Sequence, residues 1–267
     1  MDILAAVLLA VAGLIAGFLA GVFGIGGGIV LVPVLIFYLH ATGVSSLVST
    51  HVAMGTSLLV VMFASGAQGW GYWRANQVIW RGVVLVGLAG IVGGLLGSSI
   101  AAGLEGPSLR KIFGFVLLVA VARLFSGRRK QGKELEPNLA PQPLLATGLL
   151  VGLVSSLSGT GGALIAIPLM YTYMRFPLRK AFGTSSAAIV ITAAAGAAGY
   201  FIRGWGNEFL PPGMPGFIDW RPALPLILGA VPGGILGTRL ATRADTPLAR
   251  KIYAVILLVV MLRMFFL

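Results

Sequence analysis

Long apolar segments that are almost free of charged residues recur along the 267-residue chain. A helix needs about 20 such residues to cross the hydrocarbon core of a bilayer. Only 10% of the residues are charged, whereas about a quarter are charged in a typical soluble domain. The chain is therefore predicted to be an all-α polytopic membrane protein. Long segments lie at residues 3–22, 47–67, 82–103, 108–126, 143–158, 180–202, 222–241 and 249–267, and short ones at 29–40 and 163–174.

The two halves of the chain carry the same motifs in the same order. GFLAGVFGIGGGIVLVPVL at 17–35 aligns with GLVSSLSGTGGALIAIPLM at 152–170, and a Gly-Thr-Ser segment follows each. GGLLG at 93–97 aligns with GGILG at 233–237, and both are interpreted as helix-packing motifs. The order of the matches predicts a duplication. A first transmembrane repeat, a linker and a second transmembrane repeat are expected at residues 1–126, 127–142 and 143–267.

The distribution of Lys and Arg favours five crossings in each repeat over four. An odd number inverts the second repeat relative to the first, whereas an even number leaves the repeats parallel. With the basic linker in the cytoplasm, five crossings place most other basic residues inside, and four crossings divide them almost evenly. Because cytoplasmic loops are enriched in Lys and Arg, we expect about ten transmembrane segments in two inverted five-span repeats. The basic residues then left outside are Arg110, Lys111, Arg203 and Arg221.

Each short segment spans the membrane only if an unwound stretch precedes it. About 12 helical residues reach ~18 Å, and five extended residues add up to ~17 Å. The glycine cluster before each short segment therefore predicts a discontinuous helix. Irregular backbone at membrane depth is tolerated only where protein buries it or where it lines a cavity. The positive N-terminal end of the half-helix that follows favours an anion, and close helix packing is the alternative role of the glycines.

The paired motifs resemble those of a known family. GxFGIGGGxxxVP, SGTGGAxxxxP and the Gly-Thr-Ser segments are similar to motifs of the TauE/SafE sulfite-exporter family of membrane permeases, over nearly the whole chain. The resemblance implies transport of a small sulfur-containing or carboxylate anion, such as sulfite or an organosulfonate, across a bacterial inner membrane. One departure is Ala163, which stands where the first half has Gly28.

Candidate substrate-binding residues come from the two Gly-rich breaks and from polar positions in the spans. Hydroxyl groups donate hydrogen bonds to an oxyanion without carrying charge; the alternative is a Ser or Thr that bonds back to its own helix. The predicted set is Gly24, Gly26, Gly27, Gly28, Thr56, Ser57, Gln68, Ser158, Gly159, Thr160, Gly161, Gly162, Thr184, Ser185 and Ser186. His51 is a candidate for proton coupling, with a structural role as the alternative.

Several classes of function are not supported by the sequence. All acidic residues fall in termini or loops, so no carboxylate relay for protons or sodium ions is expected inside the spans. The chain has no Cys, which excludes thiolate metal sites, and we expect no metal and no cofactor. Its net charge of +12 comes without a nucleic-acid-binding motif, so no nucleic-acid partner is expected. No phosphate-binding loop or catalytic triad is present, and an enzyme is not expected.

The leading hypothesis is a secondary transporter that moves its anion by alternating access about a central site. Its expected partners are the small anion, the lipid bilayer and, if His51 titrates, protons as the coupling ion. A passive anion channel is one alternative, and a non-transport membrane module is another. The sequence leaves the direction of transport and the oligomeric state open.

Overall fold

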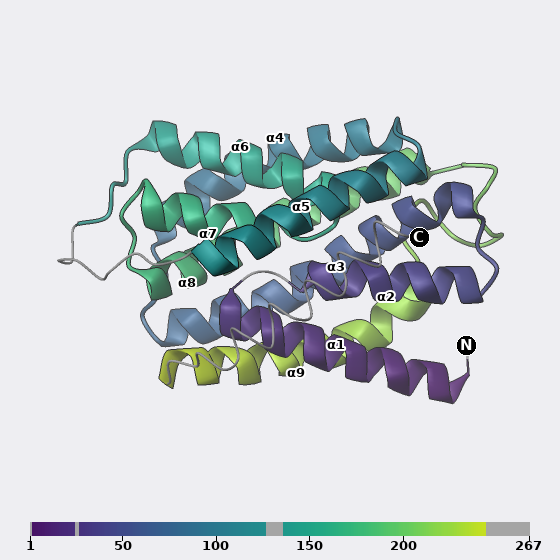
Figure 1. The fold of residues 1–267 in the computed structure, drawn as a ribbon, viewed down its shortest axis with the longest axis horizontal. Helices are drawn as coiled ribbons and strands as arrows, with labels where there is room; N and C mark the ends of the chain where they lie inside the picture. Colours follow the sequence, from purple (N-terminus) through teal and green to yellow (C-terminus); the bar gives the residue numbers. More distant parts are fainter. Residues whose placement is uncertain (1, 25–26, 127–135, 244–267) are drawn as a thin grey trace.

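The computed structural model describes residues 2–24, 27–126 and 136–243, and every regular element in these ranges is an α-helix (Figure 1). In chain order these are α1 (Ile3–Phe23), α2 (Gly28–Ala41), α3 (Ser46–Arg74), α4 (Trp80–Ala102), α5 (Gly106–Ser126), α6 (Pro141–Ser158), α7 (Ala163–Thr172), α8 (Leu178–Gly204) and α9 (Trp220–Arg243).

Six of the described helices are long and apolar enough to cross a membrane: α1, α3, α4, α6, α8 and α9. This confirms the prediction of a helical, multi-pass membrane protein. The two short predicted segments also form helices, as α2 and α7, and the predicted segment 108–126 lies within α5. The predicted segment 249–267 lies outside the described residues.

Two long helices, α3 and α8, pack against each other and run antiparallel. Near the start of α3, Gly55 lies against Tyr200 of α8, and near its end Gly69 lies against Ala187. Of the six long helices, α3 has the largest buried share. The two Gly-Thr-Ser segments, one in each of these helices, therefore lie in the interior of the bundle.

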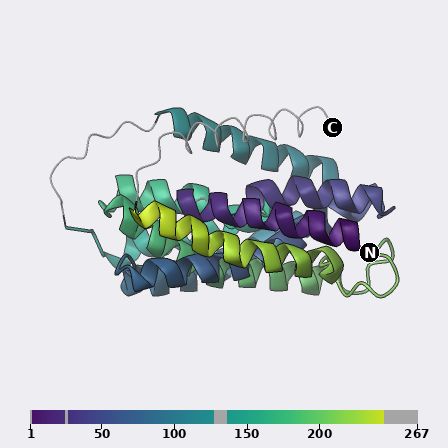
Figure 2. The ribbon, with the colours of Figure 1, turned by 90° about the horizontal axis from the view of Figure 1, so that it is seen from below.

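Two further pairs, α1 with α9 and α4 with α6, pack through small residues. Figure 2 shows α1 and α9 side by side. Gly17 of α1 lies directly against the backbone of Ala230 in α9, and Gly152 of α6 lies against Gly90 in α4. GGLLG packs on α6 and GGILG on α1, so the packing role predicted for both motifs is confirmed. Small residues permit this close backbone approach, which supplies the van der Waals contact that holds membrane helices together.

Helix α2 returns the chain from the end of α1 to the start of α3. The Tyr72 hydroxyl, near the end of α3, donates to the carbonyl of Gly21 near the end of α1 at 3.0 Å, so these two helices end on the same side. At the opposite side His40, at the end of α2, lies 3.3 Å from Ser49 at the start of α3. Helix α2 thus runs antiparallel to both of its neighbours in sequence.

Candidate functional site: two meeting helix breaks

The two predicted breaks are places where a helix ends in the same backbone conformation. α1 is followed by Gly24 and α6 by Gly159, and both glycines have φ of 65°. This left-handed conformation terminates helices and is easily reached only by glycine. The second break continues through Gly161 and Gly162, whereas Gly26 of the first lies outside the described residues. Each break is followed directly by a short helix, α2 or α7.

The two breaks meet in the interior of the protein. Gly28, the first residue of α2, lies directly against the backbone of Gly159 and Thr160, where a Cβ atom would overlap both. Ser57 of α3 donates a hydrogen bond of 2.9 Å to the carbonyl of Gly159. This contact explains why the two halves differ at this position, with Gly28 in the first and Ala163 in the second. Position 28 has no room for a methyl group, whereas Ala163 is fully buried with its methyl group in place.

Thr56 and Thr184, the threonines of the two Gly-Thr-Ser segments, accept hydrogen bonds from residues directly before other helices. Thr56 Oγ1 in α3 accepts a hydrogen bond of 2.9 Å from the backbone N–H of Asp219, directly before α9. Thr184 Oγ1 in α8 accepts one of 3.0 Å from the N–H of Ile79, directly before α4. Since these hydroxyls accept from the backbone, each keeps its own proton for donation.

Other predicted hydroxyls bond to nearby backbone or to each other. Ser185 donates to the carbonyl of Phe182 at 3.0 Å. Ser158 donates to the carbonyl of Val154 at 2.6 Å, and its oxygen lies 2.8 Å from Thr160 Oγ1 within the break. For Ser158 and Ser185 the geometry matches back-bonding to their own helix, the alternative weighed from the sequence.

Some buried polar groups have no hydrogen-bond partner among the described residues. Gln68 Nε2 and Ser186 Oγ, both predicted, belong to this group. They lie at about the same level, because Gly69 of α3 packs against Ala187 of α8. The hydroxyls of Ser155 and Ser156 in α6 are unpaired as well, and sequence reasoning missed them. The signal available was their position just before the second break. Unpaired buried polar groups of this kind are uncommon, and a bound water, ion or substrate is one explanation for them.

His51 is held by backbone carbonyls. Its Nε2 lies 3.1 Å from the carbonyl oxygen of Ala101 and 3.0 Å from that of Leu104, at the end of α4. Its ring lies 5.2 Å from that of Phe217, measured between centroids. Carbonyls only accept, so Nε2 carries a proton that ties α3 to α4. This geometry fits the structural alternative for His51.

Asp219 lies outside the helices, as the sequence indicated, but it is only 7% exposed. Its carboxylate accepts from the backbone N–H of Arg221 at 2.9 Å, at the start of α9. Burial raises the pKa of the Asp219 carboxyl, and the bond to Arg221 and its charge partly oppose that rise.

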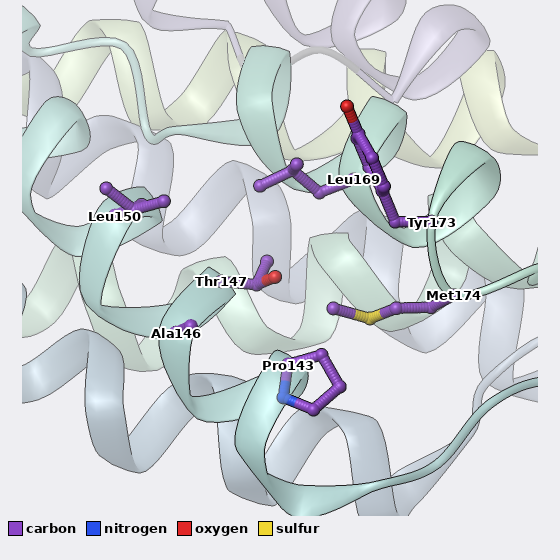
Figure 3. Close-up of a pocket in the computed structure, with 7 residues that line it drawn as sticks. All are labelled: Pro143, Ala146, Thr147, Leu150, Leu169, Tyr173 and Met174. Carbon is purple, nitrogen blue, oxygen red and sulfur yellow. The ribbon is translucent and has the colours of Figure 1, made fainter.

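A surface hollow of about 280 Å³ lies between the start of α6 and the end of α7 (Figure 3). None of the predicted site residues lines it, and its lining is mostly apolar, so it offers little to an anion. The residues around it are Pro143, Ala146, Thr147, Leu150, Leu169, Tyr173 and Met174.

The long apolar helices, together with two short helices that each follow a break, define a multi-pass membrane protein. The sequence profile of the sulfite exporter TauE/SafE family matches residues 9–264, and the chain belongs to this family. The chain is similar to a probable membrane transporter protein of Haemophilus influenzae, 26% identical over 95% of both chains, and to the probable membrane transporter protein YunE of Bacillus subtilis, 26% identical over 95% of both. A third, from Xylella fastidiosa strain 9a5c, is 28% identical over 91% of this chain and 88% of its own. No solved structure matches the chain significantly.

Proposed function

We propose that the protein is a secondary transporter that carries a small sulfur-containing or carboxylate anion through the membrane by alternating access. The observation that carries this proposal is the meeting of the two breaks at Gly28 and Gly159 in the bundle interior. Non-helical backbone is stable at membrane depth only in such protein-lined places. The N-terminal ends of α2 and α7 follow the breaks, and their free N–H groups suit a negative charge.

The binding site in this proposal consists of the two breaks, the Gly-Thr-Ser segments and the unpaired polar groups between α3 and α8. Gln68 and Ser186 contribute donors that no described residue satisfies, and Thr56 and Thr184 contribute hydroxyl protons. Neutral donors bind an anion weakly enough for release, as transport requires. Ser155 and Ser156 join the predicted set for the same reason as Gln68.

The proposed architecture is two inverted repeats of five spans, joined by a cytoplasmic linker in a bacterial inner membrane. Three observations support it: α3 and α8 run antiparallel although they carry matching motifs, α2 makes a separate return between α1 and α3, and the hydrogen bonds of Thr56 and Thr184 match each other. Inverted repeats that rock about a shared central site are a common basis of alternating access.

Uptake into liposomes tests the proposal. Purified protein is reconstituted, and uptake of labelled sulfite, methanesulfonate, sulfate and acetate is measured with and without a pH gradient. Saturable uptake of at least one anion is expected, and saturable uptake of none would refute the proposal. A passive channel is distinguished by the absence of counterflow, in which internal unlabelled anion drives uptake of the labelled one.

The pH-gradient arm also tests proton coupling through His51. Wild-type protein is compared with His51→Gln, which retains a donor toward the carbonyls of Ala101 and Leu104. Loss of the gradient dependence in the variant supports coupling through His51. An unchanged dependence assigns the residue to structure alone.

A further inference from the structure

A partly buried arginine lies where α2 ends and where α3 and α5 begin. Arg110, in the second turn of α5, donates from Nε to Thr50 Oγ1 at 2.8 Å. Its Nη2 lies 3.4 Å from Ser49 Oγ and 3.4 Å from His40 Nε2. Ser49 and Thr50 are completely buried, so they hold the guanidinium from within the protein. Arg110, His40, Ser49 and Thr50 are named the Arg110 cluster.

Among the described residues, no hydrogen-bond partner of Arg110 carries a negative charge. Two are hydroxyls, and the third is the imidazole of His40, which can accept from a guanidinium only through an unprotonated Nε2. The guanidinium of Arg110 is partly removed from water, and none of these contacts supplies a negative charge to balance it. A charge in that position is costly unless an opposite charge pairs with it.

The guanidinium has donors to spare for such a partner. It carries five N–H groups in a planar fork, and only the Nε contact has a short distance. The two contacts of Nη2, with Ser49 Oγ and His40 Nε2, are both 3.4 Å long, which is longer than usual hydrogen bonds, and they hold this group weakly. An arginine fork matches two oxygens of a carboxylate, sulfonate or phosphate group.

We propose that the Arg110 cluster is a second anion site, which binds an oxyanion group through the Nη atoms of Arg110, while the buried Ser49 and Thr50 hold the guanidinium in place. It lies at the opposite end of α2 from Gly28 and is separate from the two breaks. A free small anion and the phosphate of a lipid headgroup present the same chemistry. Only the choice of methanesulfonate as the probe rests on the proposed function.

Binding to the detergent-solubilised full chain tests the proposal. Methanesulfonate is titrated by calorimetry, and its effect on Tm is recorded, for the wild type, Arg110→Gln, Arg110→Lys and the neighbouring exposed control Lys111→Gln. Loss of one charge-assisted contact predicts about tenfold or more weaker binding in Arg110→Gln. Arg110→Lys keeps the charge without the fork and is expected to lie between. Lys111→Gln is expected to bind like the wild type.

A second arm identifies a lipid as the source. The protein is placed in nanodiscs of phosphatidylcholine with or without phosphatidylglycerol, and bound lipid is counted by native mass spectrometry. Binding that Arg110→Gln reduces, in either arm, supports the site. Equal binding by wild type and Arg110→Gln in both arms overturns it. Arg110-dependent binding in a protein that transports no anion would refute only the proposed function.

Discussion

Gly27 and Gly28 are neighbours in one cluster, but the space around them differs. A Cβ on Gly28 would overlap the backbone of Gly159 and Thr160, whereas on Gly27 its nearest contact is the carbonyl of Ala16 at 3.4 Å. The contact of the two breaks therefore depends on Gly28, and Gly27 provides a matched control.

Gly28→Ala is expected to separate the two breaks, to abolish anion uptake and to destabilise the protein by about 1–3 kcal/mol, the typical cost of overpacking. Gly27→Ala has room for its methyl group and is expected to keep a Tm near that of the wild type. Liposome uptake and Tm in detergent measure both effects. Wild-type uptake by Gly28→Ala would show that the contact between the breaks is unimportant for transport.

Two buried tyrosines make matching hydrogen bonds. Tyr72 donates to the carbonyl of Gly21 at 3.0 Å, and Tyr200 donates to that of Ser156 at 2.9 Å. Each follows a glycine, in the Gly-Tyr pairs at 71–72 and 199–200, one in each half of the chain. Each hydroxyl therefore ties a long central helix to the helix that ends at a break.

Tyr72→Phe and Tyr200→Phe are each expected to cost about 0.5–2 kcal/mol, because a buried carbonyl loses its donor. The control is Tyr173→Phe, whose side chain is 71% exposed. Thermal unfolding in detergent gives the three values. A Tm unchanged in both buried variants would contradict the assigned role of these bonds.

The sequence indicated where the two breaks lie better than it indicated what each residue there contacts. It singled out the glycine clusters and the Gly-Thr-Ser segments from their repetition. It could not separate Gly27 from Gly28, since the difference lies in a contact with Gly159, far away in the chain. It missed Ser155 and Ser156 for the same reason, because an unpaired hydroxyl is recognised only once its surroundings are known.

At the scale of elements, apolar runs predicted the described helices well, and packing decided their ends. α3 was expected to end at residue 67 but continues to Arg74. The last two turns of α3 are rich in Gly, Trp and Tyr, which lowers the local hydropathy. The helix nevertheless continues through them, because Tyr72 is completely buried there. The tertiary contact outweighs the local composition.

The first turns of α4 and α9 are each preceded by a backbone N–H that donates to a threonine in another helix. Thr56→Val and Thr184→Val remove the acceptors for the N–H groups of Asp219 and Ile79. Each is expected to destabilise by about 0.5–2 kcal/mol, as loss of a helix cap does. Thr242→Val, which removes bonds only to its own helix, is the control. Unfolding curves that match the control would contradict a capping role.

At the scale of the whole molecule, the absence of Cys permits a direct test of topology. Single Cys residues at Arg74, Arg179 and Arg203 are labelled with an impermeant maleimide from either side of the membrane. Inverted repeats predict Arg74 and Arg179 inside and Arg203 outside. Parallel repeats exchange the sides of the last two and would contradict the proposal.

The pairing of α1 with α9 and of α4 with α6 crosses the proposed boundary between the repeats. A chain cut inside the linker 127–142 is therefore expected to be stable only when the two halves are expressed together. Co-purification and size-exclusion chromatography measure this. A monodisperse single half would contradict it, because each half would then fold without its partner helices.

The pairing of α1 with α9 also has a consequence for biogenesis. About 200 residues separate the two helices, so at the ribosome's ~5–20 residues per second α1 waits in the membrane for roughly 10–40 s. During this time its glycine-rich face meets lipid or the insertion machinery. α1 is the most apolar of the six long helices. This high hydropathy stabilises it in the membrane before its partner α9 is synthesised.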